Sequence, residues 1–261
     1  MGENQLISRV NAAYIYGSVG GTTGDLWGIR TVKNEAGQVV IGADGNSLIT
    51  PELQYCGSVY PAWRAGWNNE FVIKNFRISF SFDGQKGGLI YSQTHHKLTE
   101  LGKLSHTLDG RLPGTPNYIA GDDPRIAAAG LQPIGGLYIV GEGVVENPDG
   151  SYSPNERLIT ARDWYERHYR LSNVETNSFD ASYIKLREAR IEFNVPSRLL
   201  DGIFIERASV ALYGRNLYTW SSFPIFDPET SAVHGDAIVP GIEMGQLPTP
   251  RSFGINFNFI F

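Results

Sequence analysis

The sequence contains one cysteine, Cys56, among 261 residues. A single cysteine cannot close a disulfide within the chain, and it lacks the partner ligands that a zinc site requires. Charged residues are also scarce, at 19%, against about 25% in ordinary soluble domains. The 22 Lys and Arg are outnumbered by 27 Asp and Glu, which gives a formal net charge of −5. Because no cluster of basic residues occurs either, a nucleic-acid-binding surface is not predicted.

No apolar stretch is long enough for a transmembrane helix, which needs about 20 such residues in succession. This does not argue against membrane β-strands, because these are short and alternate polar with apolar residues. The mean hydropathy of −0.21 fits either class. The first residues show no basic segment followed by an apolar one, so no signal peptide is expected. No nucleophile-elbow, Walker A or dinucleotide-binding pattern is present, so neither an enzyme nor a cofactor site is predicted.

Glycine and aromatic residues, in contrast, are plentiful. The chain has 30 Gly, 13 Tyr, 13 Phe and 5 Trp, whereas glycine averages only about 7% of a protein. Many glycines and aromatic rings combined with few charges favour an all-β chain rich in turns over a helical bundle.

The C-terminal segment carries the clearest pattern. Large apolar side chains occupy every second position and end on the last residue, at Phe253, Ile255, Phe257, Phe259 and Phe261. Successive side chains of a β-strand point to opposite faces, so these five share one face. Their burial is worth on the order of 10 kcal/mol, at roughly 2 kcal/mol each. Something apolar therefore has to cover them.

Six strands are predicted, at about 6–16, 63–72, 76–91, 183–195, 207–220 and 252–261. In the fourth, the apolar residues change from even to odd positions near Glu188, which predicts a β-bulge. The links after the second and fourth strands are short, whereas the other three are long and rich in Gly, Pro, Asn and Asp. Short turns at one end and long loops at the other are typical of outer-membrane barrels. We therefore predict an all-β fold in which about six antiparallel transmembrane strands belong to a larger β-barrel with long extracellular loops.

Aromatic residues lie at the loop ends of these strands, at Trp63, Tyr91 and Trp220. In a membrane barrel, such residues form a girdle at the level of the lipid headgroups. The expected lipid faces of 76–82 and 253–261 carry no charge. The alternating series that ends at Phe261 is also the expected signal for outer-membrane assembly in Gram-negative cells.

Histidines and carboxylates suggest other sites. His95 and His96, with His106 and His168 elsewhere, could be imagined as zinc ligands, but no Cys or carboxylate lies at ligand spacing, and a solvated loop is predicted.

The carboxylate groups 122–123 and Asp227/Glu229 are candidates for a Ca²⁺ site or for paired glycosidase acids, but they lack the spacing of a calcium loop. Loop aromatics could equally stack on sugar rings or pack the loops together, at Trp27, Tyr118, Tyr138 and Trp164.

Five motifs, in order, resemble the C-terminal part of SusC/RagA-type TonB-dependent outer-membrane transporters. They lie at residues 61–76, 83–88 (DGQKGG), 179–188 (FDASYIKLRE), 214–220 (GRNLYTW) and 226–261, which begins with FDPE. The resemblance implies a plugged barrel of about 22 strands, located in the outer membrane of a Gram-negative bacterium. It also implies a SusD-like surface lipoprotein as partner, contact with outer-membrane lipid, a glycan or peptide ligand, and import energised through TonB.

A complete member of that family also has a signal peptide, a TonB-contacting segment and a plug domain, and none of these is expected before Leu6. Residues 1–261 are therefore expected to be the C-terminal part of such a barrel. A soluble, secreted β-sandwich that binds carbohydrate is the alternative, and it would cover the alternating apolar residues with a second sheet. A glycosidase is the least favoured reading, because it requires two carboxylates together in a cleft.

Overall fold

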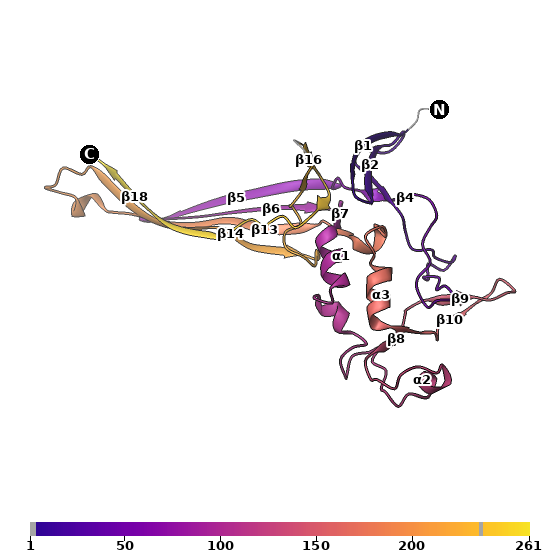
Figure 1. The fold of residues 1–261 in the computed structure, drawn as a ribbon. Coiled ribbons are helices and arrows are strands. Elements are labelled where there is room, and N and C mark those ends of the chain that lie inside the picture. The colour runs from indigo at the N-terminus through magenta and orange to yellow at the C-terminus, as the bar shows by residue number, and fades with distance from the viewer. Residues whose placement is uncertain (1–3, 235–236) are drawn as a thin grey trace. The chain divides into compact units, whose positions relative to one another are not determined.

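Five long antiparallel strands form one sheet, in the order β18, β14, β13, β6 and β5 (Figure 1). In this computed structural model, which describes residues 4–234 and 237–261, the chain divides into two units. The sheet belongs to unit 2, which consists of Tyr60–Gly88, Asp180–Thr230 and Gln246–Phe261. Unit 1 consists of Met1–Val59, Leu89–Phe179 and Ser231–Gly245.

Strands β5 (Trp63–Ile73) and β6 (Phe76–Lys86) form a hairpin in unit 2. The turn between them has only two residues, and Lys74 adopts the left-handed conformation with φ 53°, as tight hairpin turns require. The prediction that these two strands are antiparallel neighbours is confirmed.

Strand β13 (Tyr183–Asn194) pairs with β6 on one side and with β14 (Arg207–Ser221) on the other. Its register with both neighbours shifts between Leu186 and Glu188, so the predicted bulge is confirmed. The bulge moves the apolar residues of β13 from even to odd positions while keeping them on one face.

Residues 195–206 connect β13 to β14 and contain the short helix η3 (Ser197–Leu199). The last strand, β18 (Ser252–Ile260), pairs antiparallel with β14. Among the described strands, β18 and β5 therefore form the two edges of the sheet.

Unit 1 begins with a four-stranded antiparallel sheet of β1 (Gln5–Val10), β2 (Ala13–Gly17), β3 (Asp25–Gly28) and β4 (Gln54–Ser58). Its other strands are short: β7 (Leu89–Ser92), β8 (Tyr138–Val140), β9 (Val144–Glu146), β10 (Tyr152–Pro154), β11 (Leu158–Thr160), β15 (Ala232–His234), β16 (Ala237–Val239) and β17 (Ile242–Glu243). Strand β12 (Ser178–Asp180) pairs with β7 and ends at the boundary between the units.

Helices interrupt the long connections of unit 1: α1 (Gln93–Glu100), η1 (Ser105–Leu108), α2 (Pro124–Ala128), α3 (Ala161–His168) and η2 (Glu175–Asn177). Ser92 caps α1, because its side chain accepts a hydrogen bond from the amide of His95. Thr160 caps α3 in the same way through Asp163. No helix within the described residues is both long and apolar enough to cross a membrane.

Unit 1 has its own hydrophobic core, to which Leu26, Tyr91, Val174 and Ile242 contribute fully buried side chains. A second cluster of buried residues includes Ile139 on β8 and Trp164 on α3.

Two strand predictions are wrong. Residues 6–16 do not form one long strand of the large sheet, because β1 and β2 fold back on each other as a hairpin in unit 1. Residues 76–91 divide into β6 and β7, which belong to different sheets. The large sheet of this chain consequently has five strands, and the predicted count of six is corrected.

Candidate functional site

One face of the five-stranded sheet is almost entirely apolar. Directly paired residues of antiparallel strands point to the same side, and one row of pairs crosses all five strands through Phe71, Ile78, Ile191, Leu212 and Ile255. We call this face the apolar belt, and its members are Trp67, Phe71, Ile73, Phe76, Ile78, Phe80, Phe82, Ile184, Leu186, Ile191, Phe193, Val210, Leu212, Tyr218, Trp220, Phe253, Ile255, Phe257 and Phe259.

The opposite face of the same sheet is polar. Its corresponding row of pairs runs through Asn68, Ser81, Glu188, Arg215 and Ser252. The strict alternation of the two kinds of residue in the sequence thus produces a sheet with one apolar and one polar face.

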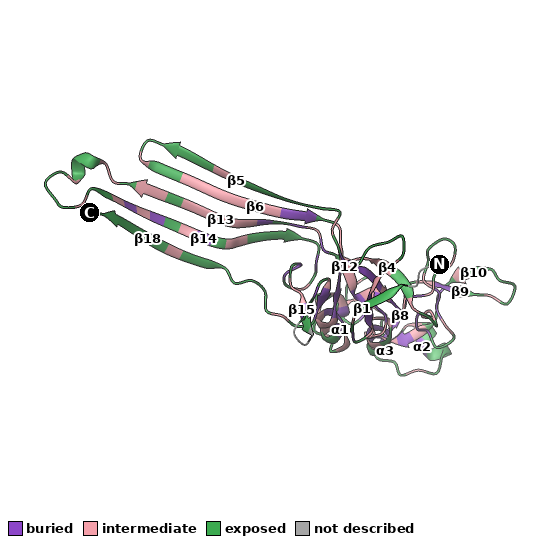
Figure 2. Ribbon diagram, turned by 90° about the horizontal axis from the view of Figure 1, so that it is seen from above, coloured by how far each residue is buried: buried purple, intermediate pink, exposed green. Residues whose placement is uncertain are grey.

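Most side chains of the apolar belt are exposed in this chain. Figure 2 shows β5 and β18 as largely exposed strands, and the side chains of Phe253 and Phe257 are 74% and 63% exposed. Ile255 and Phe259 on the same strand are exposed as well, as is the terminal Phe261. Within the described residues, no second sheet covers these side chains.

The three predicted girdle residues do not lie together. Trp63 and Trp220 are exposed, and Trp220 shares a row of pairs with Ile184, Gly84 and Ala65, two residues from Trp63 along β5. Tyr91 is completely buried in unit 1. Its hydroxyl donates to the carbonyl of Leu171 at 3.0 Å, so its assignment as a girdle residue is wrong.

A buried ionic cluster lies in unit 2, at the start of β13. Lys185 donates to Asp227 at 2.6 Å and also to Glu229, and its side chain is 3% exposed. Arg187, the residue in the bulge, donates to Asp83 and to Glu229. The cluster ties the segment 227–229 to β13, and Arg187 links it in turn to Asp83 on β6.

The electrostatics of this cluster argue against a catalytic carboxylate pair. Burial opposes ionisation of Asp227, but the hydrogen bonds from Lys185 and from the amide of Glu229 hold its pKa below its usual range. Burial of Glu229 is likewise outweighed by Arg187 and Lys185, and its pKa is also lowered. A glycosidase needs one carboxyl with a raised pKa as its acid, so these groups suit a structural role. The ionic cluster could have been predicted from the sequence, because Lys185 and Arg187 occupy polar positions of a predicted strand.

His95 and His96 are buried, His106 and His168 are half-buried, and the predicted solvated loop is wrong. His95 and His96 lie on α1 and are each 4% exposed. Nδ1 of His95 donates to Oδ1 of Asn177 at 2.9 Å, and the His95 ring packs on that of His106 with centroids 5.1 Å apart. Burial lowers the pKa of all of them, and that of His106 falls to about 4. Across residues 4–234 and 237–261, no three His, Cys, Asp or Glu side chains are placed to hold a metal ion.

Asp123 has a local structural role. Its side chain caps α2 through the amide of Arg125 and forms an ion pair with the Arg125 guanidinium at 2.8 Å.

Most of the loop aromatic residues pack against other side chains of unit 1. Trp164 and Tyr138 are buried in hydrophobic clusters, and Trp27 makes edge contacts with Tyr16 and Tyr55. The half-buried Tyr118 belongs to the same unit.

The comparisons with known proteins agree with the pattern of the sheet. No protein-family model matches the chain. It is 26% identical over 245 residues to TonB-dependent receptor P26 of Formosa agariphila, covering 91% of this chain and 21% of the receptor. It is 25% identical to TonB-dependent receptor P3 of the same organism, covering 88% of this chain and 19% of the receptor. The chain thus spans about a fifth of the length of these curated relatives.

Solved structures share the fold. The RagAB peptide importer in its closed-closed state matches with a TM-score of 0.53 and 14% identity, over 97% of this chain and 28% of that one. The same importer in its open-open state matches with a TM-score of 0.51 and 13% identity, over 91% and 22%. The predicted resemblance is confirmed: this chain is similar in sequence to two TonB-dependent receptors, and it shares its fold with part of the RagAB peptide importer.

Proposed function

We propose that residues 1–261 form the C-terminal part of the barrel of a TonB-dependent importer that takes up glycans or peptides across the outer membrane. The strands of unit 2 are then part of the barrel wall, and unit 1 is its extracellular loop region. A SusD-like surface lipoprotein captures the ligand, and energy arrives through TonB by way of an N-terminal part of the receptor. The role is transport, and no catalytic residue is assigned.

The apolar belt is the observation that carries this proposal. Exposing so many large apolar side chains on one face is costly in water, because each is worth roughly 1.5–3 kcal/mol when removed from it. Membrane lipid would cover this face without a second layer of protein. The belt carries no charged side chain, as a lipid-facing surface requires. We assign Trp63 and Trp220 to the aromatic girdle at the outer headgroups, and the alternating series from Phe253 to Phe261 to the assembly signal.

The alternative of a soluble carbohydrate-binding sandwich needs a second sheet over the belt. The exposure of Phe253 and Phe257 disfavours it.

The experiment compares two neighbouring residues on opposite faces of β18. Ile255→Arg puts a charge on the lipid face, where it costs about 2–4 kcal/mol near the membrane midplane, so the amount of folded chain in outer membranes should fall sharply. Asn256→Arg is the matched control and should assemble nearly as well as the unmodified chain. Equal assembly of both variants, or recovery of the unmodified chain as a stable soluble monomer, would contradict the proposal.

A further inference from the structure

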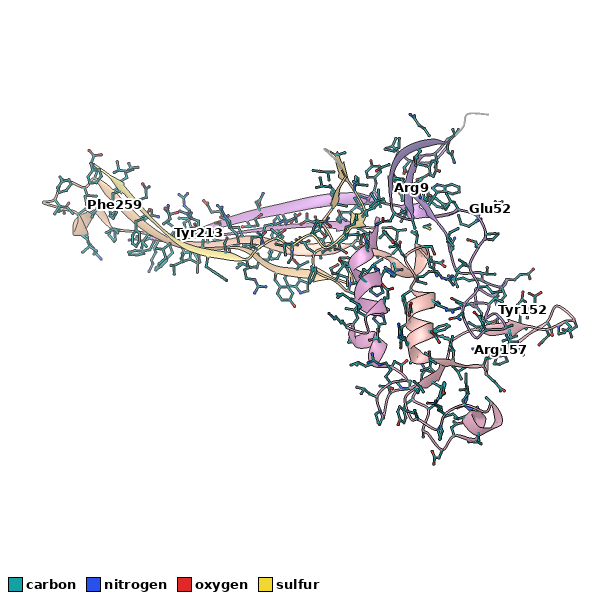
Figure 3. All side chains as sticks on the ribbon, in the orientation of Figure 1. Arg9, Glu52, Tyr152, Arg157, Tyr213 and Phe259 are labelled. Carbon is teal, nitrogen blue, oxygen red and sulfur yellow. The ribbon has the colours of Figure 1, made fainter. Side chains whose placement is uncertain are left out.

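A groove in unit 1 is lined by four basic and three acidic side chains and by the ring of Tyr14. It has a volume of about 1170 Å³ and lies among the β1–β2 hairpin, α1 and the end of α3. Its lining includes Arg9, Tyr14, Glu52, Lys97, Arg167 and Arg170. Figure 3 shows Arg9 on the hairpin and Glu52 on the segment that leads to β4.

Several charges in or beside the groove already have partners. Lys97 is paired with Glu100 at 2.8 Å, and Arg167 lies 3.3 Å from Asp44. Glu166, which also lines the groove, lies 3.4 Å from an arginine on its own helix. These pairs largely neutralise one another. Glu52 also lines the groove, so the four basic and three acidic side chains of the lining leave a net charge of +1.

Arg9 and Arg170 are different, because neither forms an ion pair with any described residue. Nε of Arg170 donates to the carbonyl of Arg167 at 2.7 Å, and Nε of Arg9 donates to the carbonyl of Asn11 at 3.1 Å. In both residues this hydrogen bond uses Nε.

Both guanidinium groups are held in place. The Cζ atom of Arg9 lies 4.7 Å from the centre of the Tyr14 ring, which favours a fixed cation over the aromatic face. Arg170 is half-buried, and burial together with the nearby charge of Arg167 lowers its pKa. A positive charge that is partly desolvated and repelled by a neighbour gains from an anion.

We infer that this groove binds the carboxylate of a ligand, with the guanidinium groups of Arg170 and Arg9 as its donors and the Tyr14 ring supporting the guanidinium of Arg9. Arginine suits this role because its planar fork donates two parallel hydrogen bonds to a carboxylate. The inference deepens the proposed function by giving the imported ligand an acidic group, and it rests on that proposal only for the position of the groove outside the membrane.

The test uses the full chain in detergent micelles and measures binding by calorimetry. One arm offers a galacturonate trimer with its methyl ester as the neutral counterpart, and the other offers tetraglutamate with tetraglutamine. An acidic sugar and an acidic peptide present the same carboxylate, so the arm that binds identifies its source. The acidic compound of that arm should bind, its neutral counterpart should not, and added salt should weaken the binding.

Variants locate the site. Arg170→Gln should weaken binding about tenfold or more, and Arg9→Gln/Arg170→Gln should abolish it, whereas Arg170→Lys should retain part of the affinity. Lys103→Gln removes one charge from an exposed position outside the groove and should bind like the unmodified chain. Absence of binding in both arms, equal binding of the neutral compounds, or unchanged binding by the double variant would overturn the inference. None of these results would alter the membrane assembly that tests the proposed function.

Discussion

Lys185 Nζ lies 2.6 Å from Asp227 Oδ1, and the two side chains are only 3% and 7% exposed. The second oxygen of Asp227 accepts a hydrogen bond from the Thr249 hydroxyl at 2.9 Å. One carboxylate thereby joins a strand of the sheet to both ends of the segment 222–251.

Removing the cation from this pair should destabilise unit 2 strongly. Lys185→Met leaves the buried carboxylate of Asp227 and the partly exposed carboxylate of Glu229 with fewer donors. Breaking a buried ion pair from one side costs about 3–5 kcal/mol. The free energy of unfolding in urea measures the loss, and faster proteolysis within 222–251 should accompany it. Arg215→Gln is the control, because it breaks the exposed pair with Glu188 and should cost less than about 1 kcal/mol. Similar losses in the two variants would show that the buried pair is not special.

Acid should weaken unit 1 through its buried histidines. Burial, reinforced by the charge of Arg170, lowers the pKa of His168 to about 4, whereas an unfolded histidine titrates near 6.5. Between these values the unfolded chain binds the extra proton, so stability falls as the pH drops from about 6.5 to about 4 and is fully present above that window. Over this pH range, His168 alone should reduce the free energy of unfolding by about 3 kcal/mol.

Urea unfolding of the unmodified chain and of His168→Gln, each followed from pH 8 to pH 4.5, checks this. The substitution itself costs some stability, since His168 stacks on Trp164 with ring centres 4.6 Å apart, but that cost is independent of pH. The unmodified chain should therefore lose more stability toward acid than the variant does. Parallel curves for the two chains would assign the acid sensitivity to other groups.

The large sheet was predictable because its information is local. The alternation from Phe253 to Phe261 indicates which side chains share a face. The change of the apolar residues from even to odd positions near Glu188 indicates where the bulge lies. Both patterns depend only on the two-residue period of a strand, so they can be interpreted without knowledge of the rest of the fold.

The core of unit 1 was not predictable in the same way. Tyr91 ends a segment that looks like the continuation of β6, but β7 pairs in parallel with β17, far along the chain. His95 and His96 read as loop residues because a helix of eight residues has little periodicity of its own. The local signal that could have revealed α1 is Ser92 as a cap ahead of a run without Gly or Pro.

Because Tyr91 is buried and Trp220 is exposed, substitutions of Tyr91 should destabilise the fold more than substitution of Trp220. Tyr91→Phe removes the hydroxyl that bonds the carbonyl of Leu171 and should cost about 1–2 kcal/mol, and Tyr91→Ala should cost about 3–5 kcal/mol through the cavity. Trp220→Phe, at an exposed position, should change the free energy of unfolding by less than about 0.5 kcal/mol. Urea unfolding measures all three. A neutral Tyr91→Phe variant would contradict the buried position.

Two variants separate the proposed assembly signal at Phe253–Phe261 from a simple packing effect. The ring of Phe261 stacks on that of Phe204 in the 195–206 turn, with centres 5.5 Å apart and planes inclined by 14°. Such a pair adds only about 0.5–1.5 kcal/mol beyond the burial of the rings. Deletion of Phe261 removes the last member of the alternating series and should markedly reduce the fraction of chain that reaches outer membranes in folded form. Phe204→Ala removes the same stacking contact but leaves the series intact, so it should assemble almost normally. If both changes reduced assembly equally, the stack with the turn, and not the terminal aromatic residue, would be the feature on which assembly depends.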